Sequence, residues 1–167
     1  YAMADGRLFL IRQEAPEHPE ALPQLTWLSA LALSSDLRTV AVAEESRIRL
    51  LDVPGRRFTR VYEGAGRRIQ RLAFSPDDTL LLAAELEGAV RVLRVADGRE
   101  VAVLRGHSQR VAHVAFSPAL GLLTAGWDGA VQRWDLGRLG ASAQSLQQAV
   151  TARWGMSAEE ALRATTP

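Results

Sequence analysis

A repeat of about 41 residues that ends in a Trp-Asp pair constrains this chain more than any other feature. Its clearest copy spans residues 104–136 and contains a Gly-His pair, an Asp-Gly turn and the closing Trp134-Asp135. The turn position recurs at intervals of 40, 42 and 41 residues, at Gly6, Ser46, Gly88 and Gly129. A fixed period of this length is typical of a repeat architecture, in which each unit packs mainly on its neighbours. The sequence therefore predicts a row of similar small units.

Each unit contains short apolar runs bounded by Gly, Pro, Asp and Ser, a pattern typical of strands. One set follows the turn residues, at 7–12, 47–53, 89–95 and 130–136. An inner set lies at 28–33, 69–74 and 111–116, and a middle set at 38–43, 79–84 and 122–125. Weaker outer runs lie at 57–62 and 99–104, whereas the Pro-rich segment 13–24 is expected to be a long loop. Each unit is therefore expected to be a four-stranded antiparallel sheet.

One such sheet cannot cover both of its faces by itself. Radial stacking of several sheets covers the faces and leaves only short edges, which is the arrangement of a β-propeller. We therefore predict an all-β fold of propeller blades over residues 1–140, with an incomplete first blade, followed by a tail over 141–167. Helical spacing at 145–154 and a capping box at 157–160 predict a short helical tail. Part of 141–150 is an alternative outer strand for the last blade.

These residues resemble the WD-repeat β-propeller family over about 1–136, with the full motif in the last unit and degenerate motifs in the others. In that family a His, a Ser or Thr, an Asp and a Trp form a hydrogen-bond network inside a blade. The resemblance places this network at His107, Thr124, Asp128 and Trp134. The preceding unit has Ala65, Ala83, Glu87 and Leu93 at these positions, and the unit before it has Ala41, Glu45 and Leu51. Those two units are therefore expected to depend on apolar packing.

The resemblance also implies that partners bind one rim of the propeller. That rim is formed by the residues just before each inner strand and just before each turn Asp. In this chain those residues are Trp27, Arg67, Arg68, Gln109, Arg110 and Trp127. Because Trp and Arg dominate binding hot spots, we expect a protein or peptide partner there. The alternative is that these are ordinary rim residues without a partner.

Composition excludes several other classes of function. The chain has 167 residues, a formal net charge of +1, no cysteine and three widely spaced histidines, so we expect no metal site, no cofactor and no disulfide. No apolar run is long enough to span a membrane. No nucleophile or paired-carboxylate arrangement stands apart from the network above, so we expect no enzymatic activity. The near-neutral charge leaves nucleic-acid binding as a minor alternative. All 20 basic residues are arginine, which suggests a GC-rich bacterial source. We also expect a cytoplasmic protein.

The number of blades is the remaining question, because propellers normally close with about 4–8 blades. The missing blades are expected from the same longer chain or from another subunit; a complete protein with an open edge is the third possibility. The expected function is a scaffold or sensor platform for protein interaction, at the C-terminal end of a larger bacterial signalling or defence protein. The alternatives are a half-propeller subunit that completes a ring with another chain, and a catalytic or nucleic-acid-binding propeller.

Overall fold

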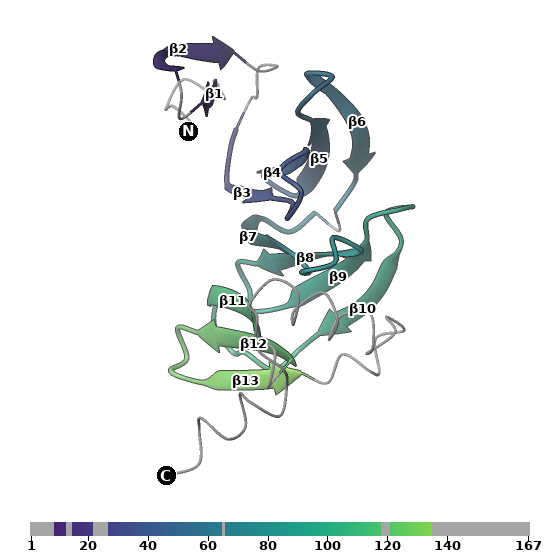
Figure 1. The fold of residues 1–167 in the computed structure, drawn as a ribbon. Coiled ribbons are helices and arrows are strands. Elements are labelled where there is room, and N and C mark those ends of the chain that lie inside the picture. The colour runs from purple at the N-terminus through teal and green to yellow at the C-terminus, as the bar shows by residue number, and fades with distance from the viewer. Residues whose placement is uncertain (1–8, 13–14, 22–26, 65, 118–120, 135–167) are drawn as a thin grey trace.

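Three of the described antiparallel sheets stack side by side as propeller blades (Figure 1). The computed structural model describes residues 9–12, 15–21, 27–64, 66–117 and 121–134. Blade 1 contains β3 (Ala30–Leu33), β4 (Thr39–Glu44), β5 (Arg47–Asp52) and β6 (Arg57–Tyr62). Blade 2 contains β7 (Ile69–Phe74), β8 (Leu80–Glu85), β9 (Val90–Arg94) and β10 (Glu100–Leu104). In the described part of blade 3 there are three strands, β11 (Val111–Ser117), β12 (Gly121–Gly126) and β13 (Val131–Trp134).

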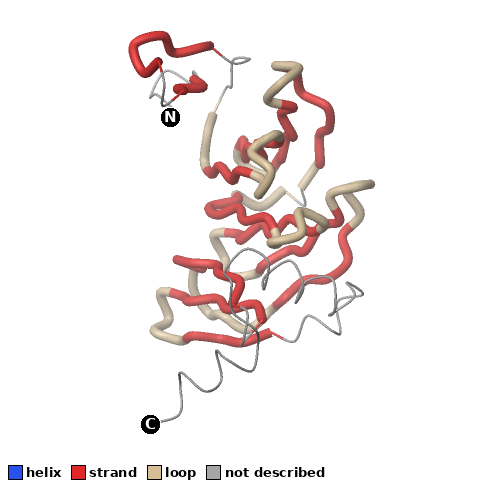
Figure 2. Tube along the Cα trace, in the orientation of Figure 1, coloured by secondary structure: helices blue, strands red, loops and turns tan. Residues whose placement is uncertain are grey.

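The remaining sheet corrects one expectation. Within segment 13–24, residues 15–21 do not form a loop, because β2 (Ala15–Ala21) pairs antiparallel with β1 (Phe9–Arg12), with Phe9 opposite Ala21. The two prolines of β2 are compatible with a strand because each strand of a two-stranded sheet is an edge strand, where proline is tolerated. The predicted helical tail, and any outer strand from 141–150, lie outside the described residues. Figure 2 shows strands and loops but no helix in the described part of the chain, and no helix there is long and apolar enough to cross a membrane.

The blades are copies of one another in register as well as in strand order. In each blade, an alanine near the end of the second strand lies opposite an aliphatic residue near the start of the third strand. These pairs are Ala43↔Ile48, Ala84↔Val90 and Ala125↔Val131. Gly88 and Gly129 lie in the turns that follow, both with positive φ, as the repeat predicts. Blade 1 makes a shorter turn in which Glu45, not Ser46, has positive φ. This difference accounts for the uneven spacing of the turn residues.

Two interfaces of packed apolar side chains, one between each pair of neighbouring blades, hold the three blades together, and we call them seams. Leu50 of β5 lies in one core cluster with Leu72 of β7 and Leu81 of β8, and this cluster joins blades 1 and 2. A second cluster joins Val92 of β9 to Leu122 of β12. Strand β8 is buried along its whole length because a blade covers each of its faces. The inner strands β3, β7 and β11 lie side by side, so their ends meet on one edge of the molecule (Figure 1).

Polar contacts tie the blades at both ends of the seams. Asp78, in the turn between β7 and β8, accepts the backbone N–H of Ser35 in blade 1 at 2.9 Å. The Tyr62 hydroxyl donates to the carbonyl of Val95 in blade 2 at 2.9 Å. The N–H of Ile69 donates to the carbonyl of Glu45 at 2.7 Å. These contacts fix the position of one blade against the next, which the apolar seams by themselves would not do.

Candidate functional site

One blade contains a buried network of four polar side chains. In blade 3, His107 Nε2 lies 2.8 Å from Thr124 Oγ1, and its Nδ1 lies 3.1 Å from both oxygens of Asp128. Trp134 Nε1–H donates to Thr124 Oγ1 at 2.9 Å. With the proton on Nδ1, the ring donates to Asp128, Thr124 donates to Nε2 and also accepts from Trp134, so every group has a partner. The structure therefore brings together all four residues that the sequence assigns to the network.

Asp128 also holds the backbone around the network. It accepts the N–H of Ala130 at 3.1 Å and the N–H of Ser108 at 2.9 Å. The hydrogen bond from Ala130 is the main cause that lowers the pKa of Asp128 below its usual value, with His107 and Ser108 acting in the same direction against desolvation. The carboxylate is therefore ionised at neutral pH. Because Thr124 is buried and its oxygen is shared by two partners, this set has the properties of a structural network and lacks an accessible nucleophile.

Blades 1 and 2 have buried apolar residues at the network positions, as expected, among them Ala83 and Leu93 of blade 2, and beside them a polar arrangement that the sequence did not predict. In blade 2, Glu85 is 2% exposed and accepts a hydrogen bond from Arg91 Nε at 2.5 Å. In blade 1, Glu44 accepts from Arg49 Nη1 at 3.0 Å, and the Arg49 guanidinium also lies 3.4 Å from the centre of the Phe58 ring. A buried ion pair thus replaces the histidine network in these two blades.

The two arrangements exclude each other sterically. The ladder register places Gly126 where the other blades have their buried glutamate, and Gln132 where they have the paired arginine. A Cβ atom on Gly126 would lie 2.4 Å from His107 Nδ1 and 2.5 Å from Asp128 Oδ1. A blade therefore has room for the histidine network or for the Glu–Arg pair. The sequence analysis missed these Glu–Arg pairs because the family motif concerns other positions. The signal that could have predicted them is a Glu before the turn and an Arg after it in both units.

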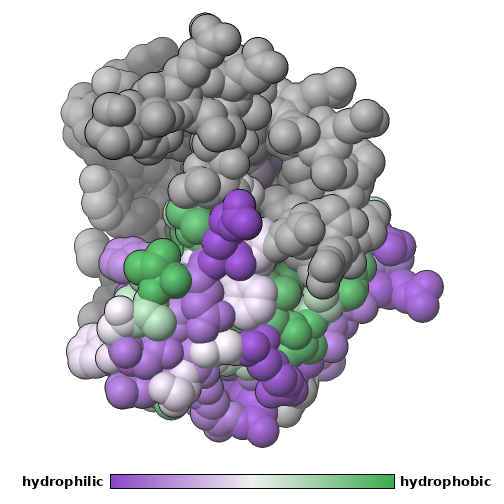
Figure 3. All heavy atoms as spheres, turned by 90° about the horizontal axis from the view of Figure 1, so that it is seen from below, coloured by the Kyte–Doolittle hydropathy of each residue, from purple (hydrophilic) through white to green (hydrophobic). Residues whose placement is uncertain are grey.

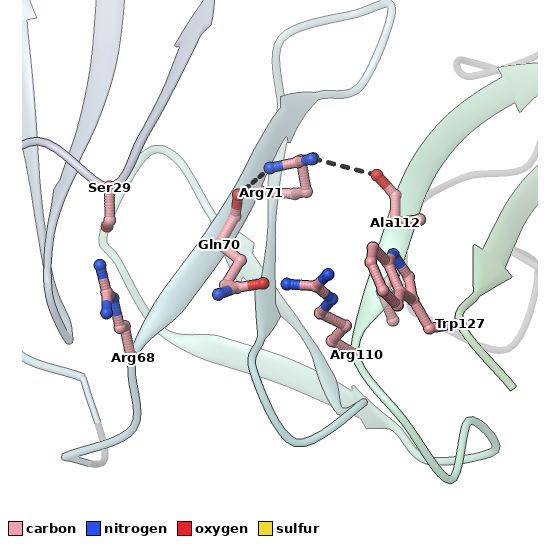
Figure 4. Close-up of a pocket in the computed structure, with 8 residues that line it drawn as sticks. Ser29, Arg68, Gln70, Arg71, Arg110, Ala112 and Trp127 are labelled. Carbon is pink, nitrogen blue, oxygen red and sulfur yellow. Dashed lines mark hydrogen bonds between the residues drawn. The ribbon is translucent and has the colours of Figure 1, made fainter.

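A pocket of about 220 Å³ lies where the inner strands of all three blades begin. Blade 1 contributes Ser29, and blade 2 contributes Arg68, Gln70 and Arg71. Blade 3 completes the wall with Arg110, Val111, Ala112 and Trp127. Figure 4 shows the polar side chains of this set directed toward a common space. We call it the arginine pocket.

The arginines of this pocket are held without acidic partners. Arg71 donates from Nε to the carbonyl of Ala112 at 3.0 Å and from Nη1 to the carbonyl of Gln70 at 2.8 Å. The Arg110 guanidinium lies 3.4 Å from the centre of the Trp127 ring. Within the described part of the chain, neither these two nor Arg68 forms an ion pair with a carboxylate. Arg67, by contrast, lies 4.0 Å from Glu85 and pairs with Glu87.

Comparison with known proteins agrees with this geometry. The family model of the WD domain, G-beta repeat, matches residues 98–135, the segment that contains the complete network. The chain contains a WD repeat. No curated protein sequence gives a significant match to the chain.

Solved structures extend the similarity from one WD repeat to the fold of the neighbouring blades. The chain is similar to one in the crystal structure of the mitotic checkpoint complex, with a TM-score of 0.70, 22% identity and coverage of 78% of this chain. It is also similar to the computationally designed Ika4 protein, with a TM-score of 0.59 and 24% identity over 68% of this chain and 69% of that one. The chain spans 41% of the length of the matched mitotic checkpoint chain. These similarities show the fold alone, which is that of stacked propeller blades.

The predicted rim divides into separate sites. Arg68, Arg110 and Trp127 line the arginine pocket together. Trp27 lines a different pocket with Glu44, Glu45 and Glu63, and Arg67 lines a third one between blades 1 and 2. Gln109 is exposed and lines neither the arginine pocket nor the other two.

The sequence did not assign Ser29, Gln70 or Arg71 to the rim. A charged residue inside an apolar inner strand was the available signal for Arg71. Ser29 and Gln70 carry no comparable signal, because their place in the wall depends on how three blades meet.

Proposed function

We propose that this protein is a protein-interaction platform whose arginine pocket and adjoining Trp127 form the partner-binding surface. WD-repeat propeller domains are generally interaction scaffolds and usually non-catalytic. The observation that carries the proposal is Trp127, which is 61% exposed and stacks on Arg110 beside a pocket shared by three blades. An exposed tryptophan next to arginines is the composition of a binding hot spot. The proposal extends to a cytoplasmic bacterial protein with a signalling or defence role; the use of arginine for all 20 basic residues supports the bacterial source, because it is typical of coding from a GC-rich genome.

The platform is rigid where the partner would bind. The N–H of Trp127 donates to the carbonyl of Arg110 at 3.0 Å, which joins the turn between β12 and β13 to the start of β11. Val111, the next residue, is fully buried in the seam between blades 2 and 3. Side chains on a fixed backbone lose less conformational entropy on binding, so the same contacts yield a higher affinity.

Replacing Trp127 with alanine is expected to weaken partner binding roughly 30-fold, the effect of losing a hot-spot side chain. Peptide binders would be selected by display on the wild-type chain, and their dissociation constants measured for both proteins. Leu37→Ala is the matched control, because Leu37 is also exposed but lies in the turn at the opposite end of β3. Equal affinity of the selected peptides for wild type and Trp127→Ala would contradict the proposal.

A second candidate function is a half-propeller that closes a ring with another copy. Leu31 of β3 is 43% exposed, whereas Leu72, in the same register position of blade 2, is 9% exposed because blade 1 covers it. At the other end, Val131 of β13 is 72% exposed, whereas its counterpart Val90 is fully buried. Figure 3, which views the molecule from the side of blade 3, shows apolar residues among polar ones on the visible part of that face. Blades 1 and 3 therefore each expose an aliphatic side chain at a position that blade 2 buries.

Closure by a second copy predicts a solution mass of at least twice 18.2 kDa by light scattering. Leu31→Asp is expected to reduce the mass to that of one chain, because it places a charge in the seam between blade 3 of one copy and blade 1 of the other. Leu37→Asp, an exposed position away from that face, should leave the mass unchanged. A monomeric wild-type chain would exclude this closure.

A further inference from the structure

The geometry points to a peptide with an acidic or phosphorylated side chain as the partner, with its anionic group bound in the arginine pocket. This inference rests on the proposed function, because it names the chemistry that the same surface recognises. It goes beyond a general interaction surface in assigning a charge to the ligand and a role to Arg68, Arg71 and Arg110.

The arginine pocket is positively charged. The wall of the arginine pocket contains three arginines and neither aspartate nor glutamate. The other two pockets described above are both lined by acidic residues, among them Glu44 in one and Glu85 in the other. The arginine pocket is therefore the strongly positive one of the three.

The guanidinium groups of Arg71 and Arg110 are fixed in position, but some of their N–H donors have no described acceptor. The two hydrogen bonds of Arg71 fix its guanidinium, and its remaining N–H groups have no described protein acceptor. Stacking on Trp127 orients the guanidinium of Arg110 without using its N–H groups. Figure 4 shows the side chains of Gln70 and Arg110 pointing toward each other across the pocket. Fixed guanidinium groups without acceptors suit carboxylate and phosphate, both of which accept paired hydrogen bonds from arginine.

The size of the arginine pocket and the acidic residues elsewhere on the rim favour a single anionic side chain over a polyanion. The pocket holds about 220 Å³, which suits one side chain and not a continuous charged strand. The pocket that contains Trp27 is lined by Glu44 and Glu63, which pair with Arg49 and Arg47, and by the exposed Glu45. A nucleic-acid backbone crossing the rim at this pocket would be repelled by these carboxylates, Glu45 above all. A peptide with one anionic residue avoids them, and its neighbouring residue can pack on the exposed face of Trp127.

Three labelled peptides would test the inference by fluorescence anisotropy on the full chain. They share one glycine-serine sequence and differ at a single central residue, which is phosphoserine, glutamate or glutamine. At least one anionic peptide is expected to bind about tenfold more tightly than the glutamine peptide, as is typical of charge-assisted hydrogen bonds. That binding should weaken as salt is raised, and inorganic phosphate should compete with it.

Variants then locate the binding site. Arg68→Gln and Arg110→Gln are each expected to weaken binding of the anionic peptide about tenfold. Arg68 makes no described side-chain hydrogen bond or ion pair, so the loss in its variant cannot be attributed to a disrupted fold. Arg38→Gln is the matched control, because Arg38 is an exposed arginine beyond the turn at the far end of β3. Equal melting temperatures of the variants and wild type would confirm that they are folded.

The outcomes separate the anionic ligand from the proposed function. Tighter binding of either anionic peptide than of the glutamine peptide supports the inference, and the peptide that binds more tightly identifies carboxylate or phosphate as the preferred group. Equal binding of all three peptides, lost in Trp127→Ala, overturns the anionic ligand and leaves the interaction platform intact. Binding of inorganic phosphate without any peptide, or of no probe at all, also overturns the inference; the display selection then decides the proposed function independently.

Discussion

Replacing His107 with alanine is expected to lower the free energy of unfolding by about 3 kcal/mol. The histidine ring joins Thr124 to Asp128, so its removal leaves a buried hydroxyl and a carboxylate each without one partner. A buried polar group that loses its partner costs about 1–3 kcal/mol, and the cavity left by the ring adds to this. Urea denaturation followed by tryptophan fluorescence would measure the change, since Trp134 belongs to the same network.

Thr124→Ser is the control for this first prediction. Serine keeps the oxygen that receives Trp134 Nε1–H and faces His107 Nε2, and loses one methyl group. Its expected cost is about 1 kcal/mol, the value for one buried methyl group. If His107→Ala costs no more than Thr124→Ser, the network contributes little to stability and the interpretation of blade 3 is wrong.

Arg91→Met is expected to destabilise the protein by about 3–5 kcal/mol, the cost of removing one partner from a buried ion pair. The carboxylate of Glu85 would remain almost fully buried, with Arg67 at 4.0 Å as its described ionic neighbour. Arg91 also pairs with Glu100, so the substitution removes two charge-assisted contacts. Thermal or chemical unfolding of the purified variant measures the loss.

The double variant Glu85→Gln with Arg91→Met separates charge burial from lost packing. With the carboxylate replaced by an amide, no charge remains buried, and at least half of the lost stability should return. Arg94→Met is the exposed counterpart, because the Arg94–Asp97 pair at 3.1 Å is solvent-accessible and should contribute less than about 1 kcal/mol. Equal losses from Arg91→Met and Arg94→Met would show that burial does not strengthen the pair in blade 2.

Much of the blade architecture could be predicted because strand residues are constrained locally. Apolar runs ending in Gly, Ser and Asp turns locate the inner, middle and turn-following strands, and the expected outer strand at 57–62 coincides with β6. The network of blade 3 could be assigned as well, because four residue types at family spacing specify it. Strand β2 could not, because it contains two prolines, which are rare in strands and occur mainly at sheet edges.

The buried ion pairs and the arginine pocket depend on contacts that a single unit does not encode. In the sequence, Glu85 and Arg91 look like ordinary charged surface residues. In the structure, the strand ladder places them side by side, with Glu85 buried. Ser29, Arg71 and Arg110 are distant in sequence and meet because three inner strands begin at one edge. Local patterns therefore predict the blades, whereas the sites between blades require the stacked structure.

The steric exclusion at Gly126 limits how the repeats of this chain can evolve. A glutamate there would collide with the ring of His107, and loss of Arg91 by itself would leave the buried carboxylate of Glu85 without its closest cation in blade 2. These single steps between the two arrangements are therefore destabilising. We expect a blade to exchange one arrangement for the other by duplication or recombination of a whole repeat. The unlike blades of this chain are consequently protected from becoming alike through gradual point mutation.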